Sequence, residues 1–235
     1  MNRKLRLEAF IHYTLSFIGG YFGLYAILSR CGIFASAQTN NMISLVHDLL
    51  GGSPLDFLVR AGALFLYLLA IILTVWIPEH SPCNLKLLSI GIDCIACFTL
   101  GFFPAELNPV IGLYPIFFSM AFQWCTFKGA YGFAGSTTFS TNNLRQFTTA
   151  IIHLLTGKEK EASLKIRFYG GTLLNFHLGA AASFLMWQFF ALRSIWCCLL
   201  PLTFALLLIL SEQSAALSPK KKRLLAFPAV IITRH

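Results

Sequence analysis

Residues 57–77 read FLVRAGALFLYLLAIILTVWI, an apolar run interrupted by one charged side chain, Arg60. A helix rises about 1.5 Å per residue, so this run is long enough to cross the roughly 30 Å hydrocarbon core of a membrane. The rest of the chain has the same character. Of its 235 residues, 57% are hydrophobic, 23 are Phe and only 11% are charged, whereas a soluble domain carries about a quarter charged residues. The sequence therefore predicts an all-α, polytopic membrane helical bundle.

Five further apolar segments are long enough to be read as membrane spans: Phe10–Leu28, Leu85–Phe103, Leu113–Phe127, Phe168–Phe190 and Ile195–Leu210. The first of them exceeds the apolar segment of a typical signal peptide and is followed by more membrane, so we expect it to be retained. The third is short, and we expect it to continue toward Gly132. We predict about six spanning helices in a single membrane domain, residues 1–235.

The net charge of +9 is concentrated in basic runs at both ends of the chain, Arg3–Arg6 and Lys220–Arg223, and in the internal run Lys158–Arg167. In a soluble domain such runs would suggest nucleic-acid binding. In so apolar a chain the positive-inside rule accounts for them. We therefore predict the lipid bilayer as the partner, no nucleic-acid partner, both termini in the cytoplasm, and a basic cytoplasmic tail at 212–235.

The same tripeptide, Thr-Asn-Asn, occurs at 39–41 and at 141–143. Each copy begins a short helical segment, Asn41–Leu50 or Asn142–Thr156, and the first of these is too short to span a membrane. Each copy also follows a span and a linker rich in small residues, and each precedes two more spans. This order predicts an internal two-fold repeat, 9–103 and 112–211.

The short segments allow two topologies. If they cross the membrane, each half has four spans and the halves are parallel. If they enter and return, each half has three spans and the halves are inverted. The inverted arrangement places Lys86 and the run 158–167 inside and the loop 104–111, which has no Lys or Arg, outside. The positive-inside rule favours this inverted, six-span arrangement.

Two half-helix N-termini that meet at a pseudo-two-fold axis would form a polar site near the membrane midplane. Such N-termini carry the positive end of a helix dipole and free N–H donors. The predicted substrate-binding residues are Thr39, Asn40, Asn41, Gln123, Thr141, Asn142 and Asn143. In the alternative, Thr and Asn only cap two helices packed inside the bundle.

Two ionisable residues within predicted spans, Asp93 and His177, are predicted coupling residues, because an intramembrane ionisable group is costly. Together they would form either a proton relay or a buried pair.

These features predict a membrane transporter or channel for a small polar or anionic solute. The alternative is a non-transporting structural or assembly membrane protein, and a homo-oligomer is left open. The chain has no His-Glu-x-x-His and no Gly-x-Ser-x-Gly, so we do not expect an enzyme. Cys94 and Cys97 lack a second pair or a nearby His, so no metal site and no cofactor are predicted.

Several of these residues resemble the two half-signatures of the YoaK family of uncharacterised bacterial membrane proteins. The first half is matched by Gly19-Gly20 and residues 33–41, and the second by Gln123, Thr137-Thr138 and residues 141–145. The resemblance extends roughly from Ala9 to Leu210. It implies a multi-pass protein of the bacterial inner membrane with no established substrate.

The chain departs from that family's pattern at two points. Asn40 and Asn142 stand where the family usually has Gly, and no acidic residue lies near Phe22 in the first span. The second departure argues against a mechanism that needs a carboxylate there.

Overall fold

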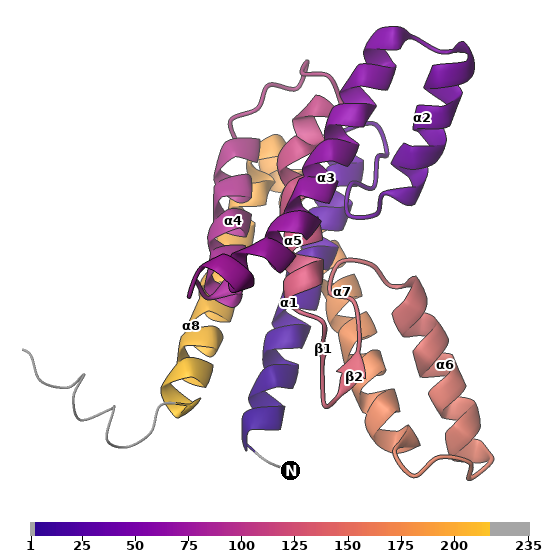
Figure 1. Cartoon of the computed structure of the whole chain (residues 1–235), viewed down its shortest axis with the longest axis vertical. Coiled ribbons are helices and arrows are strands. Elements are labelled where there is room, and N and C mark those ends of the chain that lie inside the picture. The colour runs from indigo at the N-terminus through magenta and orange to yellow at the C-terminus, as the bar shows by residue number, and fades with distance from the viewer. Residues whose placement is uncertain (1–2, 217–235) are drawn as a thin grey trace, which may run out of the picture.

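A computed structural model describes residues 3–216, and this part of the chain is almost entirely helical (Figure 1). The α-helices are α1 (Arg3–Ser29), α2 (Thr39–Gly51), α3 (Pro54–His80), α4 (Leu85–Leu100), α5 (Tyr114–Thr126), α6 (Thr141–Leu155), α7 (Ala162–Phe190) and α8 (Leu199–Ala216). Two 3₁₀ segments, η1 (Ile111–Leu113) and η2 (Ala191–Cys198), precede α5 and α8. The strands β1 (Gly129–Ala130) and β2 (Phe133–Ala134) form one small antiparallel hairpin. The predicted all-α fold is confirmed.

Three helical stretches within the described residues are long and apolar enough to cross a membrane: Arg3–Ser29, Pro54–His80 and Ala162–Ala215. The third comprises α7, η2 and α8. It reverses direction at Ala191, which has a φ of 46°, so that α8 returns to the end of the molecule at which α1 begins (Figure 1). The number of membrane crossings stays a prediction.

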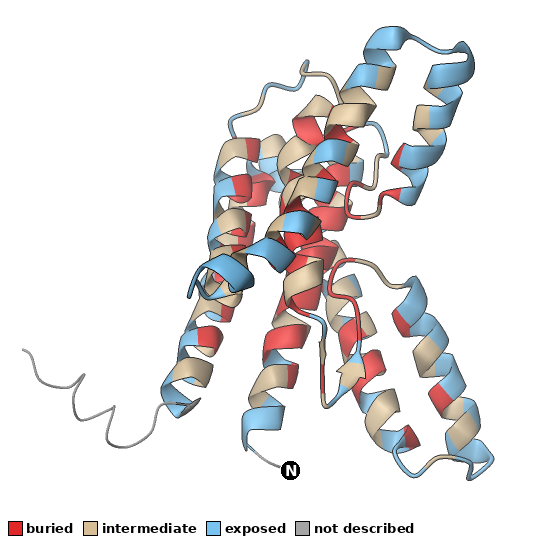
Figure 2. Cartoon of the chain, in the orientation of Figure 1, coloured by how far each residue is buried: buried red, intermediate tan, exposed pale blue. Residues whose placement is uncertain are grey.

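The core lies along the middle of the bundle, where α1 packs against α7 and α8, and α5 packs against α3 and α4 (Figure 2). Its largest fully buried side chains include Leu15, Ile18, Phe22 and Phe117. The helices α1 and α5 each pack mainly on long helices of the opposite predicted half. The first span of each half, α1 or α5, packs on the last two long helices of the other half.

α1 and α7 cross with their backbones in close contact. A Cβ atom added at Gly20 would lie 1.8 Å from the carbonyl oxygen of Phe176, and one added at Gly179 would lie 1.9 Å from that of Phe17. Small residues that let backbones approach are typical of helix pairs in membranes. At Gly20 and Gly179 there is therefore no space for a side chain.

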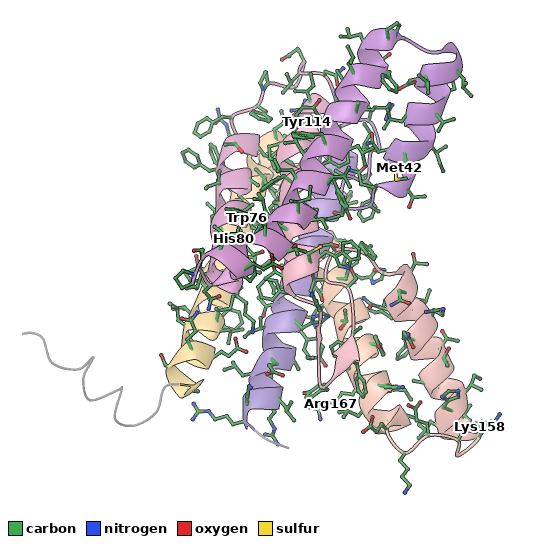
Figure 3. All side chains as sticks on the ribbon, viewed as in Figure 1. Met42, Trp76, His80, Tyr114, Lys158 and Arg167 are labelled. Carbon is green, nitrogen blue, oxygen red and sulfur yellow. The ribbon has the colours of Figure 1, made fainter. Side chains whose placement is uncertain are left out.

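The two short helices, α2 and α6, stand on one side of the bundle (Figure 1). Both begin near the middle of the molecule and run in opposite directions, α2 toward the end at which α3 begins and α6 toward the end at which α1 begins. Figure 3 shows Met42 near the inner end of α2 and Lys158 just past the outer end of α6. Each short helix thus returns to the end from which the chain approached it (Figure 1). The inverted repeat itself stays a prediction.

Each short helix is tied to the following long helix by a carboxylate that contacts both a His and a basic residue. Asp48 contacts His47 at 3.0 Å and accepts a hydrogen bond from Arg60 of α3 at 2.8 Å. Glu159 contacts His153 at 2.9 Å and pairs with Lys165 of α7. These contacts hold the outer ends of α2 and α6 against the bundle.

One predicted boundary is wrong. The predicted span Leu113–Phe127 does not continue as a helix to Gly132. It ends at Thr126, because the β1–β2 hairpin needs positive φ angles at Gly129, Tyr131 and Gly132. α8 ends at Ala216, so its last residues overlap the start of the predicted tail, and Glu212 accepts hydrogen bonds from Lys86 at 2.7 and 2.9 Å. The tail itself stays a prediction. The rest of the predicted tail, 217–235, lies outside the described residues.

Candidate solute-binding cleft

A cleft of about 980 Å³ lies where α2 and α6 begin. Its walls come from both short helices, from the linkers that precede them, and from α3, α5 and α7. The lining residues are Phe34, Ala37, Gln38, Thr39, Met42, Tyr67, Trp124, Phe139, Ser140, Thr141, Asn142, Arg145, Phe176 and His177. Both Thr-Asn-Asn segments therefore contribute to one cleft, and its lining contains one Arg, one His and no Asp or Glu.

The N-termini of α2 and α6 have no side-chain cap. The N-cap residues are Gln38 and Ser140, and neither side chain forms a capping hydrogen bond. Both have αR backbone angles instead of the β-region angles that N-cap residues usually adopt. The proposed capping role of Thr39 and Thr141 is therefore wrong, since each is the first residue of its helix. The first-turn amides are left for water or a ligand.

The three positions of the tripeptide differ in exposure, and they differ in the same way in both halves. Thr39 and Asn40 are exposed, as are Thr141 and Asn142. Thr39, Thr141 and Asn142 line the cleft, and Asn142 accepts a hydrogen bond from Arg145 Nη2 at 3.0 Å. Asn40 is exposed beside the cleft but is not part of its lining.

The third residue of each tripeptide, Asn41 or Asn143, is buried and anchors the linker that precedes its helix. Asn41 Nδ2 donates to Gln38 Oε1 at 2.9 Å and to the carbonyl of Arg60 at 3.2 Å. Asn143 Nδ2 donates to the carbonyl of Ser136 at 2.7 Å, and the Ser136 amide donates to Asn143 Oδ1 at 3.1 Å. These contacts position the N-termini.

Gln123 of α5 is buried and does not line the cleft. Its Nε2 donates to the carbonyl of Leu15 at 3.3 Å and to Thr137 Oγ1 at 2.9 Å. It therefore joins α5 to α1 and to the linker before α6, and it does not contact the interior of the cleft.

No hydrogen bond or ion pair joins the two predicted coupling residues. Asp93 is fully buried in α4, and neither carboxylate oxygen has a partner among the described residues. His177 of α7 lines the cleft, and its Nδ1 lies 2.7 Å from the carbonyl of Leu173. The predicted buried pair is not formed, because α4 packs on α5 and α8, whereas α7 packs on α1 and α6.

The structure adds cleft residues that the sequence did not single out. Arg145 follows Thr141 by one helical turn, and side chains with this spacing share a helix face, so it was recognisable once the helix start was known. Tyr67, Trp124 and Phe176 carried no such signal, because each is one aromatic residue among many in an apolar run.

The apolar helices and the buried bundle core define a helical membrane protein. The chain belongs to the family described as "Protein of unknown function (DUF1275)", which matches residues 11–209. No curated protein and no solved structure matches the chain. The family is uncharacterised, as the resemblance implied, whereas the YoaK-type assignment itself stays a prediction.

Proposed function

We propose that this protein is a membrane transporter or channel for a small anionic or polar solute, and that the solute binds in the cleft between α2 and α6. One observation carries the proposal: two uncapped half-helix N-termini, which approach from opposite directions, line the same cleft. Within this proposal the protein translocates a solute and is not an enzyme.

The electrostatics of the cleft favour an anion. Each helix N-terminus carries the equivalent of roughly half a positive charge and presents free N–H donors. Arg145 adds a full positive charge, and no acidic side chain lines the cleft. These charges attract an anion and oppose a cation.

Two structural features support the inverted repeat within this proposal. The long helices of the two halves exchange neighbours in matching pairs. The outer ends of α2 and α6 carry matching His–carboxylate–cation contacts. We further propose a bacterial inner-membrane location with both termini in the cytoplasm. Arg3 and Lys4 begin α1, and Lys158 and Arg167 lie at the same end of the molecule (Figure 3).

The proposal is tested by solute flux in liposomes that contain the purified protein. The panel is chloride, nitrate, formate, phosphate and an uncharged polyol, each measured with the protein and with empty liposomes. We expect flux of at least one anion. The double variant Thr39→Val/Asn142→Ala should lower it by about tenfold or more, since each good hydrogen bond to a charged group is worth about 1.5–3 kcal/mol.

Asn175→Ala is the matched control, because Asn175 lies outside the cleft lining and bonds within its own helix. If the double variant is incorporated into liposomes to the same extent and its flux is unchanged, the cleft is not the solute-binding site. If the wild-type protein moves none of the solutes, the non-transporting assembly role takes precedence.

The surface formed by α2 and α6 would also suit contact with a second copy of the chain. Outside the cleft lining, α2 and α6 expose large apolar side chains, among them Val46, Leu49, Leu144 and Leu155. We propose that a second copy covers this face and separates the polar helix starts from lipid, since exposed polar backbone is costly in hydrocarbon. Native mass spectrometry should detect a dimer that Val46→Lys dissociates, and a monomer at all concentrations would contradict it.

A further inference from the structure

A second, smaller cavity of about 100 Å³ lies at the end of the bundle where α1 begins. It is partly open, and it is bordered by the first part of α1, the start of α4, the end of α5 and the segment that follows α5. The lining residues are Glu8, Ile11, His12, Lys86, Thr126, Phe127, Lys128 and Gly129. None of them lines the cleft between α2 and α6, so the two sites are distinct.

His12 is the central feature of this cavity. Its side chain is 1% exposed, and neither ring nitrogen has a hydrogen-bond partner among the described residues. The Oγ1 atom of Thr126, also buried, lacks a partner as well. Burying such groups without partners costs free energy, and buried polar groups in proteins are nearly always satisfied. The ring of Phe168 lies 5.0 Å from the imidazole and holds it in place. The His12 imidazole and the Thr126 hydroxyl are thus two buried polar groups that can bind a ligand or water.

The charges around the cavity leave an excess of positive charge. Lys86 is neutralised by Glu212, with N–O distances of 2.7 and 2.9 Å, and Glu8 lies 3.9 Å from Lys4. Lys128 forms no ion pair within residues 3–216. An imidazole N–H, a hydroxyl and an ammonium are all hydrogen-bond donors, and together they match an acceptor with negative charge.

We propose that this cavity binds a small inorganic monoanion, of the size of a halide or nitrate. The ligand accepts hydrogen bonds from His12, Thr126 and Lys128. The small volume favours such a ligand, because a water molecule occupies about 30 Å³ in the liquid, so that about 100 Å³ corresponds to roughly three waters. This site does not depend on transport through the cleft.

The test compares thermal unfolding of the detergent-purified protein in sodium bromide and in sodium gluconate at equal ionic strength. Gluconate has the same charge as bromide but is too large for the cavity. A ligand that binds only the folded state raises the melting temperature, so we expect a higher melting temperature in bromide, increasing with its concentration. The Thr39→Val/Asn142→Ala protein should show the same increase, which separates this cavity from the cleft.

The variant Thr126→Val/Lys128→Gln should lose the bromide effect, whereas the matched control Thr99→Val/Lys158→Gln should keep it. Lys128→Gln alone should weaken the effect, and this exposed side chain can be replaced without disturbing the fold. Equal melting temperatures in bromide and gluconate would mean that the cavity holds only water and would overturn the proposal. A bromide effect that survives in Thr126→Val/Lys128→Gln would overturn it as well, because the anion would then bind elsewhere.

Discussion

Replacing Gly20 with Ala should destabilise the protein and disturb the cleft together, because Gly20 lies where α1 contacts α7. The added Cβ would stand 1.8 Å from the carbonyl oxygen of Phe176. Phe176 and His177 line the cleft. A methyl group on α1 therefore presses directly on the part of α7 that forms the cleft wall.

The size of the effect follows from this distance. Non-bonded carbon contacts are most favourable near 3.5–4.0 Å, so α7 would have to move by roughly 1.5 Å or more. The obstructing atom belongs to the backbone and cannot rotate away. Overpacking typically costs about 1–3 kcal/mol, and we expect a loss of about 3 kcal/mol at this rigid contact. For a chain of this size, that corresponds to a fall in melting temperature of about 6–12 °C.

The assay is thermal unfolding in detergent, followed by anion flux in liposomes. Gly91→Ala is the matched control, since Gly91 also lies within a long apolar helix but a Cβ there meets no atom within 4 Å. It should be neutral or stabilising by up to about 1 kcal/mol, because Ala favours helix more than Gly does. Equal melting temperatures for Gly20→Ala and Gly91→Ala would refute the close crossing of α1 and α7.

Three further changes test other parts of the fold. Arg30 is 3% exposed and donates to the carbonyls of Pro104 and Ala105 at 3.0 Å each. Arg30→Met should therefore lower the free energy of unfolding by about 2–3 kcal/mol and speed proteolysis of the loop at 101–110. A loop that is cleaved no faster than in the wild type would contradict this. Hydrogen bonds from Lys165 and His153 hold the pKa of Glu159 below its usual range. Because that pKa is lower in the folded state, Glu159 stabilises the protein above its unfolded pKa, and this contribution is lost as the pH falls through the folded pKa. Melting temperatures measured between neutral and acid pH should therefore fall less steeply for Glu159→Gln than for the wild type, and parallel curves would exclude the contact. Asp93→Asn should fold at least as stably as the wild type because the carboxylate loses no partner, and a lower melting temperature would reveal one.

The sequence was most informative about the helices. Long apolar runs identify α1, α3, α4, α7 and α8, because burial in lipid demands continuous apolar length. The helices α1 and α7 begin before their apolar runs, at Arg3 and Ala162, and α8 continues past its run to Ala216. It was less informative where a helix ends for a local reason. α5 stops at Thr126 because the following residues form a hairpin with three positive φ angles. The glycines at 129 and 132 lie in the predicted linker of small residues, but this pattern did not specify a hairpin.

The site was predictable only in part. The two Thr-Asn-Asn copies indicated that two helix starts belong together, and the structure places both at one cleft. Gln123 and Asp93 were chosen as isolated polar residues in apolar runs. That criterion detects buried polar groups but does not distinguish a residue that faces a cleft from one that joins two helices, as Gln123 does.

The two short helices, α2 and α6, begin in the same way although the chain reaches them by different paths. The chain reaches α2 through a linker anchored by Gln38 and Asn41, and it reaches α6 through a hairpin and a linker anchored by Ser136 and Asn143. The approaches differ, yet in both halves the first two residues of the tripeptide are exposed and the third is buried. If Thr-Asn-Asn served only to hold its linker, the two linkers would be expected to have similar paths. The common feature is instead an uncapped N-terminus at the cleft, and the proposed binding of one solute by both halves rests on this feature.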